Sequence, residues 1–210
     1  MFESKDIFIS ANVKRGHDFE TLLNELKKKL LVEGNGRPVG IGQLINNIRN
    51  LLTGKDTYDA NFSADRMVIY PIIVTHDAMF DAPDLNKLLQ SFFSDELIKL
   101  RLEGTDISRI EPLVIMNIDY LIVAGHLFHF GRIRFEELLE AFHENCRWPK
   151  TLSISKEHQM QEFHNSNLSL QGYFPHFLGA KFDNRWESLV LMRHFFEKFE
   201  IDGRELFFKD

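Results

Sequence analysis

The sequence predicts an α/β protein with a mixed or parallel sheet flanked by helices, followed by a helical C-terminal region. Its 210 residues are 44% hydrophobic and 27% charged, which is enough apolar material for one well-buried core. Short β-branched runs alternate with amphipathic helical segments between residues 1 and 144, the pattern of a sheet covered by helices. We therefore place the core at residues 1–147 and a linker with a helical extension at 148–210.

The first elements are a strand and two helices. The β-prone segment FESKDIFIS covers residues 2–10. Asp18 can cap a helix that runs to about Glu33, because leucines recur there at helical spacing. A turn rich in glycine follows, and a second helix is expected from Ile41 to Leu52, with its apolar residues on one stripe.

The following elements alternate in the same way. Met67–Thr75 is an apolar run typical of a buried strand, although Pro71 suggests a sheet edge or a bulge. A helix over 85–102 ends at Gly104, and a second buried strand begins after Pro112. The remaining predictions are helices over 119–129, 134–144 and 185–199, and a polar loop over 148–172.

Composition limits the possible functions. A single cysteine, Cys146, excludes an internal disulfide framework and favours a reducing, cytoplasmic compartment. The apolar runs are too short to span a bilayer, so no membrane role is expected. The net charge of -6 argues against a protein covered in nucleic acid, but one basic face of an enzyme could still contact DNA.

The opening strand carries the best candidate for chemistry. Side chains alternate along a strand, so Glu3 and Lys5 point to the same side, roughly 7 Å apart. A metal-dependent phosphodiesterase needs a carboxylate to hold Mg²⁺ and a cation to stabilise charge on the phosphate. Two charges on a solvated strand face are the commoner explanation of Glu-x-Lys taken alone.

The context of this pair resembles a known superfamily. Glu3-Ser4-Lys5-Asp6, an amphipathic helix, Gly40-Ile41-Gly42-Gln43-Leu44 and the strand over 69–74 together resemble the downstream part of PD-(D/E)xK, or restriction-endonuclease-like, nucleases. The resemblance implies hydrolysis of DNA phosphodiesters with Mg²⁺. It makes Glu3 the metal ligand, Lys5 the phosphate-facing cation and Gln43 an auxiliary residue on the helix.

The first catalytic acid of that superfamily precedes the Glu-x-Lys strand, and here only Met1 and Phe2 precede Glu3. We therefore expect the chain to be the downstream piece of a longer protein, a non-catalytic remnant, or a protein whose sheet a partner chain or second copy completes. As it stands, the chain should be inactive or nearly so.

A basic cluster close to the proposed site could bind substrate phosphates through Lys14, Arg15 and Lys28. The more general explanation is the solvated face of a leucine-rich helix. His76 and Asp77 follow a buried strand, where a ligand site is possible, but a turn or helix cap is favoured.

Two further hypotheses remain. His126, His129, His143 and Cys146 have spacings that a zinc site could use, although packed or surface histidines are the commoner case. Alternatively, the chain is a non-catalytic interaction protein that keeps a degenerate nuclease fold and binds a partner through its helical region.

Overall fold

The computed structural model describes residues 1–5, 9–16, 18–55, 67–147 and 155–182. The chain divides into two compact units, Met1–Ile118 and Asp119–Asp210. This division falls just after the third predicted strand, the run that follows Pro112, whereas the sequence placed the end of the core at residue 147. Each unit is described by itself below.

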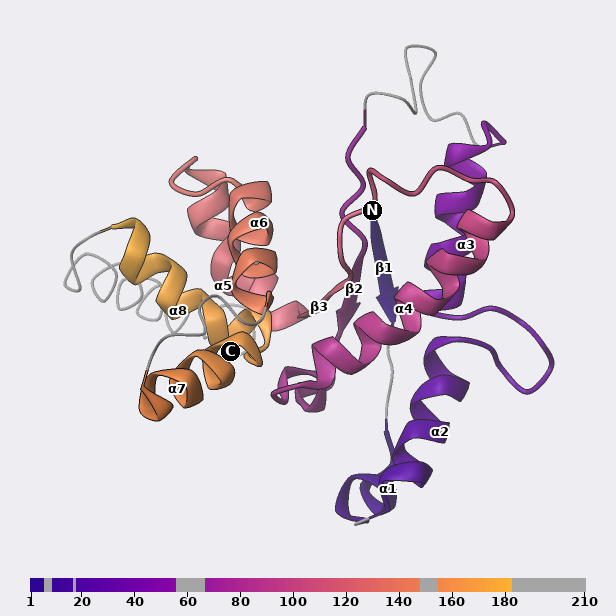
Figure 1. Ribbon diagram of the computed structural model, residues 1–210, viewed down its shortest axis with the longest axis horizontal. Coiled ribbons are helices and arrows are strands. Elements are labelled where there is room, and N and C mark those ends of the chain that lie inside the picture. Colours follow the sequence, from indigo (N-terminus) through magenta and orange to yellow (C-terminus); the bar gives the residue numbers. More distant parts are fainter. Residues whose placement is uncertain (6–8, 17, 56–66, 148–154, 183–210) are drawn as a thin grey trace, which may run out of the picture. The chain divides into compact units, whose positions relative to one another are not determined.

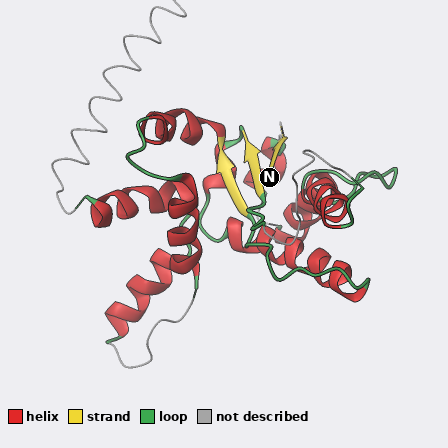
Figure 2. Cartoon of the chain, turned by 90° about the horizontal axis from the view of Figure 1, so that it is seen from above, coloured by secondary structure: helices red, strands yellow, loops and turns green. Residues whose placement is uncertain are grey.

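The first unit is built on a three-stranded parallel sheet (Figures 1 and 2). Its strands are β1 (Phe2–Lys5), β2 (Ile72–Thr75) and β3 (Val114–Asn117), in the spatial order β1-β2-β3. The α/β class and the parallel sheet are thus confirmed. The first strand covers Phe2–Lys5, and residues 6–8 of the predicted strand lie outside the described part of the chain.

The expectation that Pro71 marks a sheet edge is wrong. Pro71 lies immediately before β2, which is the central strand of the three. Its carbonyl accepts a hydrogen bond from Val114 N at 3.0 Å, and its missing N–H costs no bond within the strand. A proline one residue before a strand is therefore compatible with a central position.

Helices and one 3-10 turn connect the strands. They are α1 (Ala11–Arg15), α2 (Phe19–Leu30), α3 (Ile41–Leu52), η2 (Ala78–Asp81) and α4 (Leu85–Leu102). The predictions for α3 and α4 are confirmed, and Asp18 caps α2 as expected by accepting from Glu20 N at 3.0 Å. The helix α1 was not predicted. Ser10 caps it, with its side chain accepting from Val13 N.

The glycine-rich turn allows α3 to start against the end of α2. Gly40 has a φ of 51°, a conformation that L side chains rarely adopt. A Cβ at Gly42 would lie 2.3 Å from the carbonyl oxygen of Leu31. Glycine is therefore needed at both positions, and the close approach fixes where the first turn of α3 begins.

The outer edge of β3 is covered by polar side chains of α4. Asn86 accepts a hydrogen bond from Ile115 N at 2.8 Å, and Gln90 accepts one from Leu113 N. These contacts satisfy backbone donors that an edge strand would otherwise present to another chain. This edge of the sheet is thus blocked from within the unit.

The second unit begins one residue into α5 (Ile118–His129), a helix that starts one residue before its predicted start. It also contains α6 (Phe135–Cys146), α7 (Lys156–Ser166) and α8 (Leu170–Lys181). The predicted loop over 148–172 is wrong where α7 and α8 form. Helix α7 has few apolar residues, which explains why periodicity missed it. Ser169 caps α8 by accepting from Gly172 N at 3.1 Å. The predicted helix over 185–199 lies outside the described residues.

Candidate functional site

The strand β1 presents Glu3 to the core side of the sheet. Glu3 pairs in register with Ile73 of β2, which pairs with Ile115 of β3. Neighbours in register point to the same face. Ile73 and Ile115 belong to one apolar cluster with buried residues of α3 and α4. Glu3 is half-buried on this face.

The helix α3 brings Gln43 to the same side of the sheet. Gln43 lies in the first turn of α3 and is half-buried, while its neighbour Leu44 is fully buried in the shared core. Lys5 pairs in register with Thr75, two residues beyond Glu3 along the strand. The side chain of Lys5 lies outside the described part of the structure.

Glu3 is the one carboxylate that the predicted site draws from the described residues. Mg²⁺ is usually held by one or two carboxylates, together with waters and substrate oxygens in near-octahedral geometry. In the ranges that the structure describes, no group of three or more His, Cys, Asp or Glu side chains could hold a metal ion. Glu3 could supply one carboxylate, and any further ligand would have to come from elsewhere.

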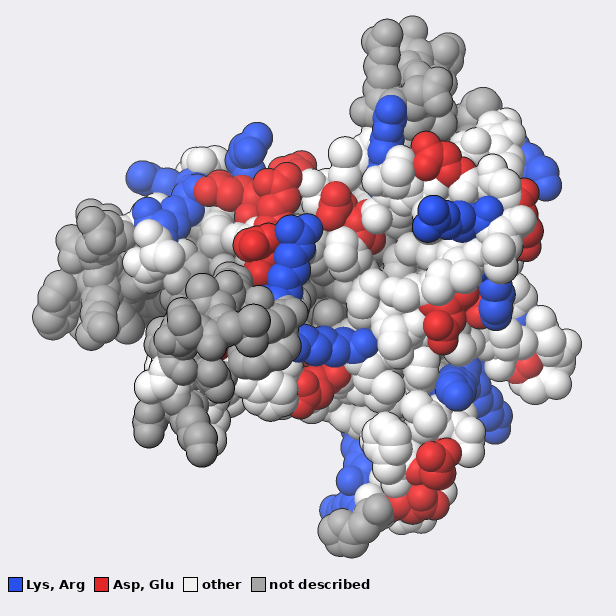
Figure 3. Space-filling view, in the orientation of Figure 1, with Lys and Arg blue, Asp and Glu red and all other residues white. Residues whose placement is uncertain are grey.

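The predicted basic cluster is dispersed. Lys14 forms an ion pair with Asp77 at 2.5 Å, and Arg15 and Lys28 are exposed. Lys14 and Arg15 end α1, whereas Lys28 lies in the last turn of the next helix, α2. Positive and negative side chains are also intermixed on the face shown in Figure 3. Lys14 therefore has a structural partner, which weakens the prediction that it binds the phosphates of a substrate.

Asp77 serves as a turn residue, as the sequence favoured. Its carboxylate accepts from Met79 N at 3.0 Å and caps η2. Burial by itself would raise the pKa of Asp77, but hydrogen bonds from Lys14, Met79 and Ile9, together with the charge of Lys14, outweigh it and lower the pKa. Asp77 thus ties the segment after β1 to the end of β2.

Two polar residues end the strands β2 and β3 at their carboxyl side. Thr75 and Asn117 are register partners and are 0% and 4% exposed. Asn117 donates to Asp81 Oδ2 at 3.3 Å, whereas Thr75 Oγ1 has no hydrogen-bond partner within the described residues. The available signal was a polar residue at the last position of each apolar run.

The zinc hypothesis gains no support from the described histidines. His129 is exposed, and its ring packs edge-on against Phe130 with 5.1 Å between centroids. His143 is buried on α6, beside the ring of Phe142. The side chain of His126 lies outside the described part of the chain, so the four-residue zinc site stays a prediction.

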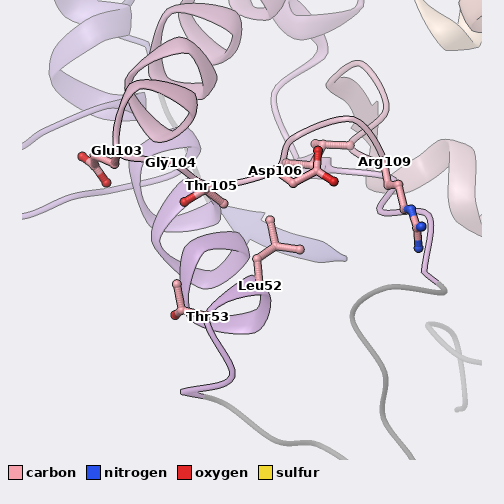
Figure 4. Close-up of a pocket in the computed structure, with 8 residues that line it drawn as sticks. Leu52, Thr53, Glu103, Gly104, Thr105, Asp106 and Arg109 are labelled. Carbon is pink, nitrogen blue, oxygen red and sulfur yellow. The ribbon is translucent and has the colours of Figure 1, made fainter.

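An open cavity of about 340 Å³ lies near the opposite, amino ends of the strands (Figure 4). Its lining comes from the ends of α3 and α4 and from the loop before β3: Leu52, Thr53, Glu103, Gly104, Thr105, Asp106, Arg109 and Ile110. Nothing in the sequence indicated this cavity, because its two groups of residues are fifty positions apart and have no motif spacing.

No known protein family, curated protein or solved structure matches this chain. Among the helices of the described residues, none combines the length and the apolar character needed to cross a membrane. The candidate sites are therefore weighed on their own geometry.

Proposed function

We propose that the first unit is a nuclease-like module in which Glu3 and Lys5 take part in Mg²⁺-dependent hydrolysis of DNA phosphodiesters. The observation that carries this proposal is the shared face of the sheet. Glu3 lies on a strand of a parallel sheet, and the helix that bears Gln43 packs on the same side. The order β1, α1, α2, α3, β2 contains the strand, the two longer helices and the second strand on which the resemblance rests, with the short α1 added between β1 and α2.

A complete site needs more carboxylates than the described residues bring together. We propose that a partner chain, or a second copy, adds a strand beside β1 and supplies the missing acid. The position follows from the edges of the sheet: Asn86 and Gln90 already cover the outer edge of β3, so an added strand would pair with β1. The described chain is then expected to show little activity alone.

Binding of a divalent cation is the direct test. Mn²⁺ titrated into the protein should broaden the amide NMR signals of Phe2–Lys5 and of the neighbouring Ile73 before other signals. Glu3→Gln should abolish this selective broadening, while Glu20→Gln, an exposed acid on α2, should leave it unchanged. Uniform broadening, or none, would contradict a metal ligand at Glu3.

Activity tests the role of Lys5. Nicking of supercoiled DNA with Mg²⁺ should be slow, and Lys5→Ala should abolish it. Ser4→Ala, on the opposite face of β1, should have no effect. Unchanged nicking in Lys5→Ala would remove Lys5 from the site.

The second candidate is a non-catalytic interaction protein. The ion pair between Lys14 and Asp77 favours it, because this pair uses a predicted substrate-binding cation for structure. It predicts no selective effect of Mn²⁺ near Glu3 and an oligomer or complex in light scattering. Stoichiometric zinc in an elemental analysis would instead favour the zinc-stabilised module.

A further inference from the structure

The cavity at the amino ends of the strands has a fixed frame. Helix α4 ends at Leu102 with Glu103 as its C-cap, the following Gly104 has a φ of 89°, and Thr105 N donates back to Leu100 O at 3.1 Å. This arrangement closes the helix end and sets the direction of the following loop. Ile110 pairs with Ile69 through an isolated parallel bridge, which anchors the far end of the same loop.

The helix ends on the other side of the cavity are tied together. Thr53 caps α3, with its hydroxyl donating to Arg49 O at 2.8 Å. Arg49 also forms an ion pair with Glu103 at 3.2 Å, which links the end of α3 to the end of α4. The cavity is therefore lined by groups whose backbone is held before any ligand arrives, and this reduces the ordering cost of binding.

Two opposite charges, Asp106 and Arg109, lie on the loop that lines the cavity. Hydrogen bonds from Ser108 are the main cause that lowers the pKa of Asp106, and the charge of Arg109 lowers it further. This carboxylate is therefore ionised at neutral pH. The guanidinium of Arg109 is the positive group of this loop. Within the described part of the chain, no ion pair of 4.0 Å or less joins Asp106 to Arg109, and both side chains are exposed.

The remaining lining supplies an apolar surface and a hydroxyl. In Figure 4 the side chain of Leu52 lies between the Glu103 and Asp106 ends of the cavity, and the Arg109 guanidinium lies beyond Asp106. Ile110 is half-buried and adds apolar surface, and Thr105 adds a hydroxyl. The charge of Glu103 is already balanced by Arg49. Asp106 and Arg109 are thus the charged groups left to recognise a ligand.

We propose that this cavity binds a free α-amino acid with an apolar side chain. The ammonium group would lie against Asp106 and the carboxylate against Arg109, because an α-amino acid carries these opposite charges a few ångströms apart. The apolar side chain would cover Leu52 and Ile110. A cavity of about 340 Å³ is at the small end of ligand sites. This inference is independent of the nuclease proposal.

A ligand series tests the need for both charges. Leucine, leucinamide, which lacks the carboxylate, and 4-methylpentanoate, which lacks the ammonium group, are titrated into the whole chain and followed by NMR. Leucine should shift the amide signals of Thr105 and Ile110, and each analogue should bind about tenfold more weakly. Equal binding of the three ligands, or no shift with leucine at tens of millimolar, would overturn the proposal.

Variants test the two residues. Asp106→Asn keeps the acceptor for Ser108 N and removes only the charge, and Arg109→Gln removes the guanidinium from an exposed position. Each substitution should lower the affinity for leucine about tenfold, whereas Asp106→Asn should not lower the affinity for 4-methylpentanoate. Arg101→Gln, an exposed arginine of α4 outside the lining, is the matched control. Equal loss in Arg101→Gln would show a general charge effect and overturn the assignment.

Discussion

The two ends of the parallel sheet use charged residues in different ways. At the carboxyl ends, Asp77 accepts hydrogen bonds from three donors, one of them the ammonium group of Lys14. At the amino ends, Asp106 accepts from its own loop, and within the described residues it makes no ion pair with the neighbouring Arg109. Ligands of parallel α/β proteins usually bind at the carboxyl ends of the strands. Here the acid at that end is largely occupied by structural contacts.

This difference separates structural charges from charges available to a ligand. An ion pair that is partly buried and linked to three elements contributes to stability, because its partners are already positioned. Exposed opposite charges on an anchored loop contribute little to stability and remain open to a ligand. Stability measurements on matched substitutions at the two ends therefore test the comparison directly.

The largest effect is expected from core packing near the carboxyl ends. Phe80 in η2 is 2% exposed, so Phe80→Ala should lower the free energy of unfolding by about 3–5 kcal/mol. Ile110 at the amino ends is only half-buried, and Ile110→Ala should cost about 1–2 kcal/mol. Urea denaturation followed by circular dichroism measures both. Equal losses would show that the two ends are packed alike.

The matched aspartates come next. Asp77→Asn removes the charge paired with Lys14 and should cost about 1–2 kcal/mol, whereas Asp106→Asn, at an exposed position, should leave the stability unchanged. The contribution of Asp77 also depends on pH. Because folding lowers its pKa, this contribution is present above the unfolded value of about 4 and is lost as the pH falls through the folded value.

Urea curves at pH 7 and at pH 3 measure this dependence. The difference between wild type and Asp77→Asn should shrink at the lower pH. A difference that stays constant would mean that the ion pair is not what Asp77 contributes.

Thr75 gives a smaller effect of opposite sign. Its buried hydroxyl has no partner among the described residues, so Thr75→Val, which keeps the shape, should stabilise the protein by about 0.5–1 kcal/mol. Thermal denaturation should show a higher midpoint. A clear loss of stability would mean that the hydroxyl is hydrogen-bonded in solution, and would contradict the stabilisation expected from its removal.

The smallest effect is expected for the ion pair between Arg49 and Glu103. Both side chains are about one-third or more exposed, at 34% and 54%, so a double-mutant cycle with Arg49→Gln and Glu103→Gln should give a coupling of about 0.5 kcal/mol or less. The same cycle on Lys14 and Asp77 should give a larger value. The reverse order would contradict the distinction between the two ends.

Local patterns in the sequence predicted much of the first unit. The apolar stripe of α3, the cap at Asp18 and the stop at Gly104 each depend on a few neighbouring residues, and each is found as expected. Helix α7 was missed because its exposed, polar sequence carries no periodic signal. The edge alternative for Pro71 was wrong because a sheet edge depends on which strands pair, and a single run of residues does not contain that information.

The sequence by itself determined the α/β class, most helix boundaries of the first unit and the position of Glu3 and Lys5 on one strand. Hydrophobic period and capping chemistry act over one or two turns, and this is why they can be found along the chain. Only the tertiary structure decided that Lys14 pairs with Asp77, 63 positions away, and that the ends of α3 and α4 enclose a cavity. Such contacts depend on how distant segments pack around the sheet.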